Sequence, residues 1–184
     1  MVPDKYKAEV IYVLDSSSFV GKENYKLEKE FTKALARMLN HGPTGTKSAV
    51  IIFDSFPERP IRMGSYTDIG RFSEAVDNLR YLGGSSQLDF ALTIAAVEFS
   101  TDSPKVPKIV IVLTNKDPSR RGSIESLAET FRQEGKVVNF FVVSLRVDAE
   151  AYFPFVNGRC HFGRSVPSLV TKPLVLVDVL YALD

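Results

Sequence analysis

Four continuous runs of apolar residues constrain the fold of this chain more than any other feature of its sequence. Each run is rich in Val, Ile or Phe, and the runs span residues 10–14, 49–53, 109–113 and 137–143. A strand with one solvated face alternates apolar and polar side chains, whereas continuous apolarity indicates burial on both faces. The runs therefore predict parallel strands in a central sheet that is covered on both sides.

Segments with apolar residues at every third or fourth position separate these runs, as expected for helices that pack one face on a sheet. The patterns predict helices within residues 27–38, 69–79, 88–99, 124–131 and 174–181. The basic residues of the first pattern fall largely on its opposite face, which we expect to be solvated; they are Lys26, Lys29, Lys33 and Arg37.

Residues 59–63 form a shorter segment beside Pro57 and Pro60, which are tolerated at the edge of a sheet but not in its centre. We expect this segment to pair antiparallel with the run at 49–53. The predicted fold class is α/β: a doubly wound, mostly parallel six-stranded sheet with one antiparallel edge strand and helices on both faces. In such a sheet Val13 and Val112 should lie on adjacent central strands.

The length and composition predict a single domain over residues 1–184 with no general affinity for polyanions. A formal net charge of +1 gives no electrostatic reason to bind nucleic acid, and no apolar stretch suits insertion into a membrane. The N-terminus lacks the apolar region of a signal peptide, which leaves the compartment open. The single cysteine, Cys160, excludes an internal disulfide and leaves a free thiol or a bond to another segment.

A carboxylate and three hydroxyl groups follow the first apolar run, in the sequence Asp15-Ser16-Ser17-Ser18. The carboxyl end of a central parallel strand is where open α/β sheets bind ligands. Carboxylate and hydroxyl oxygens are hard ligands of the kind that Mg²⁺ or Mn²⁺ prefers. The sequence therefore predicts a binding site at this edge of the sheet.

Two further motifs fall at the same predicted edge, namely Gly83-Gly84-Ser85-Ser86 before the third helix and Thr114-Asn115-Lys116 after the third run. With these motifs the chain resembles the von Willebrand factor type A domain, over nearly its whole length from Ala8 to Leu183. The resemblance implies a Rossmann-like fold. It also implies a metal-ion-dependent adhesion site built from the three motifs.

The resemblance places Asp15, Ser17 and Ser86 at the positions of metal ligands. It also indicates that the site is degenerate, because Phe19 stands where a second serine is expected and Asn115 where a second aspartate is expected. Hard divalent cations draw much of their affinity from carboxylates. We therefore expect a weak or empty site, with no cofactor beyond weakly held Mg²⁺ or Mn²⁺.

Two interpretations of these polar residues remain open. The loops at this edge of the sheet, which we call the rim, contain other carboxylates that could replace the missing carboxylate ligand. The candidates are Asp54, Asp89 and Asp117. Alternatively, the residues at positions 15, 17 and 86 only hydrogen-bond neighbouring loop amides, as Asp and Ser commonly do in turns.

The resemblance implies a non-enzymatic protein–protein interaction or adhesion module of a secreted extracellular matrix protein, most like the A domains of type VI collagen. The implied partners are extracellular matrix proteins, collagen among them, and neighbouring domains of the same chain. A basic loop with Lys116, Arg120 and Arg121 adds positive charge to the rim.

One alternative to the matrix-protein module is an intracellular A domain that acts as a scaffold. Another is an enzyme that uses the crevice of the sheet, which is disfavoured because no set of nucleophile, base or phosphate-binding residues converges there. A catalytic triad that includes Asp15 is not expected, because His41 falls near the opposite edge of the sheet.

Overall fold

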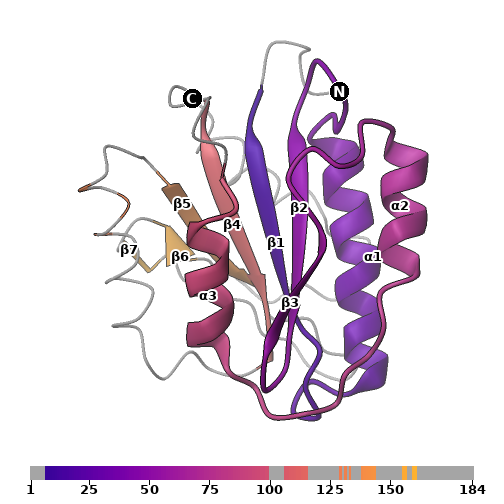
Figure 1. Cartoon of the computed structure of the whole chain (residues 1–184), viewed down its shortest axis with the longest axis vertical. Helices are drawn as coiled ribbons and strands as arrows, with labels where there is room; N and C mark the ends of the chain where they lie inside the picture. The colour runs from indigo at the N-terminus through magenta and orange to yellow at the C-terminus, as the bar shows by residue number, and fades with distance from the viewer. Residues whose placement is uncertain are drawn as a thin grey trace.

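The computed structural model describes residues 7–99, 106–115, 138–143, 155–156 and 159–160, together with positions 129, 131 and 133. The four apolar runs form strands, as predicted, and helices lie between the first three of these runs (Figure 1). The elements are β1 (Glu9–Asp15), α1 (Lys22–Met38), β2 (Lys47–Phe53), β3 (Pro57–Ile61), α2 (Ile69–Asp77), α3 (Leu88–Ala96), β4 (Lys108–Leu113), β5 (Val138–Val143), β6 (Phe155–Val156) and β7 (Arg159–Cys160).

Within the described residues five strands form one sheet, where six were predicted, and their order is β3-β2-β1-β4-β5. The strands β2, β1, β4 and β5 are parallel, and β3 pairs antiparallel with β2 at the edge, which confirms the predicted mixed sheet. Val13 is in register with both Ile51 and Val112, so the first and fourth strands are neighbours in the centre, as predicted. The short strands β6 and β7 pair with each other in a separate two-stranded sheet.

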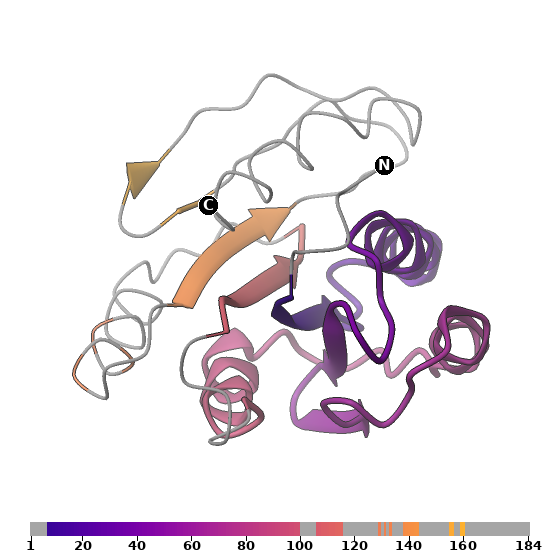
Figure 2. The ribbon, with the colours of Figure 1, turned by 90° about the horizontal axis from the view of Figure 1, so that it is seen from above.

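Helices cover both faces of the sheet, and this explains why its strands are apolar throughout. In the view of Figure 2, α1 and α2 lie on one side of the sheet and α3 lies on the other. Successive side chains of a strand point to opposite faces, so Tyr12 and Leu14 join the core under α1 and α2, whereas Ile11 and Val13 join the core under α3. All seven residues of β1 are buried.

The buried stripe of α1 is rotated from the face that the apolar pattern predicts. Leu27 and Met38 are only half-buried, whereas Glu28 and Thr32 are fully buried. The helix packs against β1 on one side and α2 on another, so its buried surface is wider than a single apolar stripe. The complete buried set is Tyr25, Glu28, Thr32, Lys33, Leu35 and Ala36.

The predicted solvated face of α1 is wrong for Lys33. The Lys33 side chain is 9% exposed, and its ammonium group contacts the carboxylates of Glu30 and Asp77. Burial alone lowers the pKa of Lys33, but the two carboxylates raise it above its ordinary value. Lys26 does face solvent, as predicted, beside Glu23.

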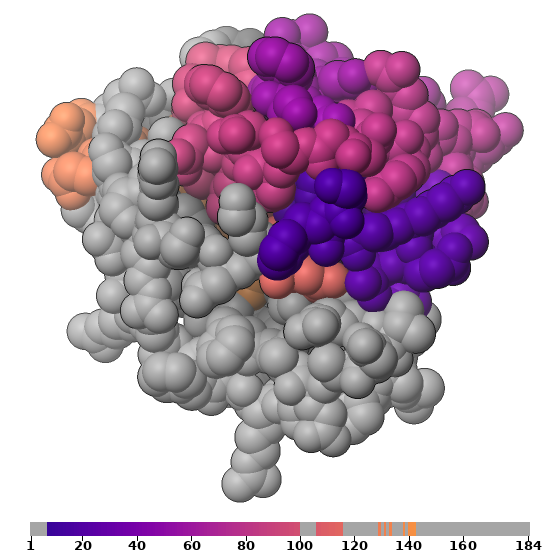
Figure 3. All heavy atoms as spheres, turned by 90° about the horizontal axis from the view of Figure 1, so that it is seen from below, coloured from indigo at the N-terminus to yellow at the C-terminus, as the bar shows by residue number. Residues whose placement is uncertain are grey.

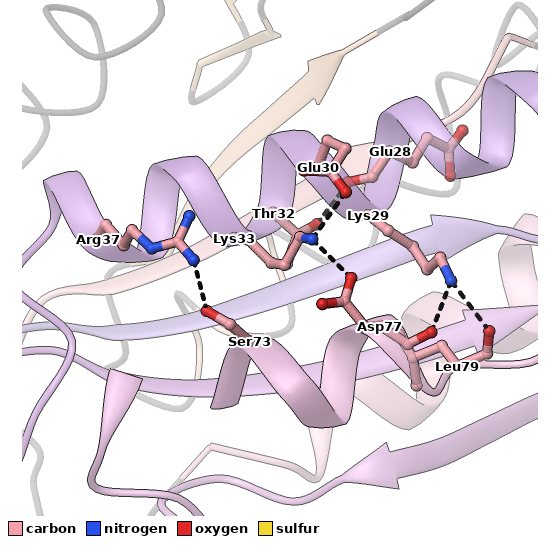
Figure 4. A network of polar contacts seen from close by, with 9 residues as sticks. All are labelled: Glu28, Lys29, Glu30, Thr32, Lys33, Arg37, Ser73, Asp77 and Leu79. Carbon is pink, nitrogen blue, oxygen red and sulfur yellow. Dashed lines mark hydrogen bonds and ion pairs between the residues drawn. The ribbon is translucent and has the colours of Figure 1, made fainter. Parts of the chain in front are cut away.

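Two other basic residues of α1, Lys29 and Arg37, also contact α2 or the residues directly after it (Figure 4). Lys29 donates to the carbonyl oxygens of Asp77 and Leu79, at 2.9 and 3.4 Å. Arg37 donates to the hydroxyl of Ser73 at 3.2 Å. The contact between α1 and α2, which we call the α1–α2 seam, was not predicted. The periodicity of one helix cannot show that a second helix will pack beside it.

An ion pair is buried where the parallel strands begin, at the end of the sheet opposite to Asp15. Lys108 of β4 donates to Oε2 of Glu9 of β1 at 3.1 Å, and both side chains are 1% exposed. The ammonium group also lies 5.8 Å from the centre of the Phe99 ring.

Within the described part of the chain, no helix is long and apolar enough to cross a membrane.

Candidate functional site

Asp15 lies at the point of the sheet where the chain order reverses. It is the last residue of β1, and the strands on the two sides of β1 are β2 and β4. The crevice beyond the carboxyl ends of strands at such a switch point is the ligand site of open α/β sheets. Asp15 is fully buried, so its carboxylate needs internal partners.

Three donors satisfy the Asp15 carboxylate. Its Oδ2 accepts hydrogen bonds from the hydroxyls of Ser86, at 2.8 Å, and Thr114, at 2.6 Å. Its Oδ1 accepts from the backbone N–H of Ser17 at 3.1 Å. The structure thus brings together the predicted residues Asp15, Ser17 and Ser86 and adds Thr114, which the sequence reasoning left out. The available sign was the position of Thr114 directly after an apolar run.

The oxygen atoms at this point fit a hard cation in type but not in charge. The Ser17 hydroxyl is buried and has no hydrogen-bond partner, so it is an available oxygen ligand next to Asp15. Two of the other hydroxyls already donate to the carboxylate. No group of three or more His, Cys, Asp or Glu residues suited to a metal occurs in the part of the chain that the structure describes. One carboxylate provides one formal negative charge for a divalent ion.

The two residues that depart from the expected ligand pattern do not restore that charge. Phe19 offers no oxygen, and its side chain is 60% exposed in the loop between β1 and α1. Asn115 follows Thr114 and is half-buried, with a neutral carboxamide in place of a carboxylate. The basic loop residues Lys116, Arg120 and Arg121 lie outside the described residues.

Asp54, one of the candidates to replace the missing carboxylate ligand, instead holds two loops together through hydrogen bonds; we call this arrangement the Asp54 clamp. Its carboxylate accepts from the backbone N–H groups of Gly84, at 3.0 Å, and Phe56, at 3.1 Å. A Cβ atom on Gly84 would clash with Oδ2 of Asp54, so any larger residue at this position would displace the Asp54 side chain. Of the other two candidates, Asp89 lies in the first turn of α3, and Asp117 lies outside the described residues.

A second acidic residue lies buried behind the site. Glu28 of α1 is fully buried, and both of its carboxylate oxygens lack a hydrogen-bond partner. Burial and the charge of nearby Asp15 raise the pKa of Glu28 well above its ordinary value. Tyr25, one turn earlier on the same helix, is 2% exposed, and burial raises the pKa of its hydroxyl. A charged residue in a helix is usually solvated, so a buried Glu28 could not be expected from its position in the sequence.

His41 lies at the edge of the sheet opposite to Asp15, as predicted. It forms a bridge with Thr46 just before β2 begins, and its Nδ1 lies 3.0 Å from the hydroxyl of Ser48. Burial lowers the pKa of His41. Asp15 and His41 lie at opposite edges of the sheet, so they cannot belong to the same catalytic triad.

The fold and site define a class of protein: a doubly wound α/β domain with a carboxylate and hydroxyl cluster at the switch point of its sheet. The family model for the von Willebrand factor type A domain matches residues 9–152, and the chain belongs to that family. The sequence resemblance is thereby confirmed.

Curated relatives include chains of collagens and of cochlin. The collagen alpha-1(XXI) chain of Xenopus laevis is 30% identical over 126 residues, which are 68% of this chain and 13% of that protein. Cochlin of Bos taurus is 27% identical over 143 residues, which are 76% of this chain and 25% of cochlin. The chain therefore spans a small part of the relatives that it matches.

Solved structures share the fold. The proximal thread matrix protein 1 from the mussel byssus, solved with a zinc-occupied MIDAS motif, matches with a TM-score of 0.66 and 26% identity, over 78% of this chain and 37% of that chain. The manganese-loaded TRAP protein of Plasmodium vivax matches with a TM-score of 0.64 and 18% identity, over 79% of this chain and 59% of that chain. The second likeness concerns the fold alone.

Proposed function

We propose that this domain is a non-enzymatic protein–protein interaction module of an extracellular matrix protein, and that its Asp15 site is a degenerate metal-ion-dependent adhesion site. Membership of the von Willebrand factor type A family and the similarity to collagen chains and cochlin support the first part. We further propose that residues 1–184 form one such domain in a secreted chain. Its partners would be matrix proteins, collagen among them, and neighbouring domains of the same chain.

One observation carries the second part of the proposal: the chain's own donors satisfy the carboxylate of Asp15. Ser86, Thr114 and the Ser17 amide all donate to it, so the loop is stable without a cation. A cation that entered would have Asp15, Ser17 and Ser86 as its ligands, and only one of these carries a negative charge. With a single carboxylate, the net gain in free energy is small.

The zinc-occupied site of the mussel byssus protein shows that a relative with 26% identity holds a metal. In this chain Phe19 and Asn115 remove two of the expected ligands. We therefore propose that weak binding of Mg²⁺ or Mn²⁺ is the most that this site provides. Partner binding would then not depend on a cation.

The test is a surface-binding titration of the domain on immobilised matrix proteins in EDTA, in Mg²⁺ and at two salt concentrations. Binding that is equal in EDTA and Mg²⁺ supports the proposal. Binding that falls as salt rises would show that the rim's positive charges contribute, because salt screens exposed charges. Loss of binding in EDTA alone would show a functional metal site and refute the degenerate one. An Asp15→Asn variant is the matched control, because it removes the remaining carboxylate ligand.

An enzyme at the same crevice has little support. The described groups around Asp15 are hydroxyls that donate to it, and His41 is at the other edge of the sheet. No histidine therefore lies beside a serine or threonine hydroxyl at this point of the described structure. Turnover in a broad hydrolase screen, lost in Asp15→Asn, would overturn this part of the proposal.

A further inference from the structure

Two arginine side chains meet on one buried carboxylate just after α3. Nη1 of Arg59 and Nε of Arg62 both lie 3.3 Å from Oε2 of Glu98, whose side chain is 3% exposed. The other carboxylate oxygen of Glu98 accepts a hydrogen bond from the backbone N–H of Met63 at 2.7 Å. Because both arginines contact the same oxygen atom, their guanidinium groups lie side by side. We call these two residues the arginine pair.

The arginine pair lies at the end of the domain opposite to Asp15. The helix α3 begins beside Ser86, which donates to Asp15, and it ends at Ala96, two residues before Glu98. In Figure 2, α3 lies beside the edge strand β3. Figure 3 views the other end of the domain, where the indigo atoms of the β1–α1 loop lie against the pink atoms of the segment before α3. A partner at the rim would therefore leave the arginine pair accessible.

One carboxylate compensates only one of the two positive charges. Within the described residues, Glu98 is the only acidic partner of either arginine. The Arg62 side chain is 63% exposed and that of Arg59 is 34% exposed. A guanidinium group has several N–H donors, so each arginine keeps donors that no described residue uses. The pair therefore combines a net positive charge with free donors that Glu98 holds in place.

The described surroundings of the arginine pair add positive charge. Lys47, the first residue of β2, is exposed, and its Cδ would lie 3.8 Å from a Cβ atom at Gly64, two residues after Arg62. The segment 100–105 lies outside the described residues and contains one aspartate and one lysine, so its formal net charge is zero. The described part of this surface therefore attracts an anion.

The chemistry of the pair favours a carboxylate as that anion. A guanidinium group donates parallel hydrogen bonds to the two oxygens of a carboxylate, and the same fork fits a sulfate or a phosphate. A sulfated polysaccharide is charged along its whole length and binds best to long basic stretches. Here two arginines and a lysine form a compact cluster around one glutamate. A single acidic side chain of a partner protein matches this cluster better.

We propose that the arginine pair binds an acidic side chain, aspartate or glutamate, of a partner protein. The partner's carboxylate accepts hydrogen bonds from Arg59 and Arg62, and no metal ion takes part. Because Glu98 already holds both arginines, binding costs little of their side-chain entropy. This inference rests on the proposed function and names one chemical group of the partner.

The experiment follows the side-chain Nε–H signals of the arginines by NMR while the isotope-labelled chain is titrated in EDTA. The probe is a peptide of alternating glycine and glutamate, and the control peptide has glutamine in place of each glutamate. The test variants are Arg62→Gln and Arg62→Lys. Lys22→Gln is the matched control, because it removes an exposed positive charge at the first residue of α1, at the other end of the domain.

We expect the acidic peptide to shift the Nε–H signals of Arg59 and Arg62 saturably and the glutamine peptide to shift neither. Arg62→Gln should weaken the binding of the acidic peptide by about tenfold, because it removes a charged hydrogen-bond donor. Arg62→Lys should weaken it less, because the charge remains while the planar fork is lost. Lys22→Gln should leave the affinity unchanged.

Three results would each overturn the inference: no shift of the arginine signals, equal shifts with the glutamine peptide, or equal affinities of the natural chain and Arg62→Gln. A heparin-derived oligosaccharide is titrated in parallel. If it binds and the acidic peptide does not, the pair recognises a polysaccharide and the inference is wrong. Backbone spectra that match the natural chain away from the changed position establish that each variant is folded.

A second measurement separates this inference from the proposed function. The natural chain and Arg62→Gln are compared on the immobilised matrix proteins in EDTA. If both bind equally, those partners do not use the arginine pair and the inference fails, although the domain is still a matrix-binding module. If the natural chain binds no matrix protein, the proposed function fails, and the peptide titration still decides whether the pair binds a carboxylate.

Discussion

At the residue scale, the site shows which roles of single residues can be predicted from the sequence and which cannot. Phe19 and Asn115 departed from an expected ligand pattern, and that departure was visible in the sequence because it concerns residue identity alone. The role of Thr114 was not visible, because it depends on how far its hydroxyl lies from Asp15 across two strands. Glu28 was missed for a similar reason, since burial of a helical carboxylate is a property of the packing.

Restoring the two missing ligands should restore metal binding. For the natural chain, millimolar Mg²⁺ should leave the thermal midpoint unchanged, because an ion at a tenth of its Kd stabilises by about 0.1 kcal/mol. The double variant Phe19→Ser with Asn115→Asp should gain about 3–5 °C at an ion concentration tenfold above Kd. Differential scanning calorimetry with and without Mg²⁺ measures both.

The control for this metal experiment adds Asp15→Asn to the double variant. The shift should then disappear, because the carboxylate nearest the available Ser17 hydroxyl is gone. A folded double variant that shows no shift would contradict the assignment of positions 19 and 115 as ligand positions.

Glu28 should make the domain less stable as the pH rises. Its pKa in the folded state is raised, so the free energy of unfolding is fully retained below the unfolded pKa near 4.5 and decreases as the pH rises towards the folded pKa. Glu28→Gln removes this titration while keeping the shape of the side chain. Urea denaturation at several pH values should show the variant gaining stability relative to the natural chain above pH 4.5. A constant difference across the range would show that Glu28 does not titrate as described.

At the scale of elements, the helices were predicted in place but not in their contacts. The apolar spacing located α1, α2 and α3 because periodicity is local information. It did not show that α1 has two neighbours, and so it assigned the buried Lys33 to a solvated face. The edge strand β3 was predicted with its antiparallel pairing because Pro57 and Pro60 exclude a central position.

Removing the carboxylate that links the two helices should destabilise the domain. Asp77→Asn leaves the ammonium group of Lys33, which is 9% exposed at the side chain, with Glu30 as its remaining charged partner. We expect a loss of about 1–2 kcal/mol in the free energy of unfolding. Glu23→Gln is the matched control, because its pair with Lys26 is exposed and such pairs contribute about 0.5 kcal/mol or less. Equal losses in urea denaturation would show that the seam adds nothing to α1.

At the scale of the whole molecule, the topology followed from burial on both faces of the strands. Continuous apolar runs left few alternatives to a covered parallel sheet, and the register confirms that Val13 and Val112 are neighbours. Residues of the predicted last helix, at 174–181, and most of those at 124–131 lie outside the described residues. The positions of the loops at the rim could not be predicted, because they depend on contacts between residues about thirty or more positions apart, such as Asp54 with Gly84.

A charge in the centre of the sheet should abolish folding. Val112→Asp places an unpaired carboxylate in the core under α3, at a cost of several kcal/mol, which is comparable to the whole stability of many domains. Val97→Asp, at a side chain that is 69% exposed, should stay folded. Circular dichroism and gel filtration of the two variants provide the comparison, and a soluble, folded Val112→Asp variant would contradict the central position of β4.

The clamp that Asp54 forms has a kinetic consequence for recognition. Because its carboxylate holds Gly84 and Phe56 in the unbound protein, the loops of the rim are ordered before a partner arrives. Association then loses little conformational entropy in these loops and needs no slow rearrangement of them. Affinity differences among related partners should accordingly reside in how long each complex lasts, and a change at Asp54 should slow the encounter itself.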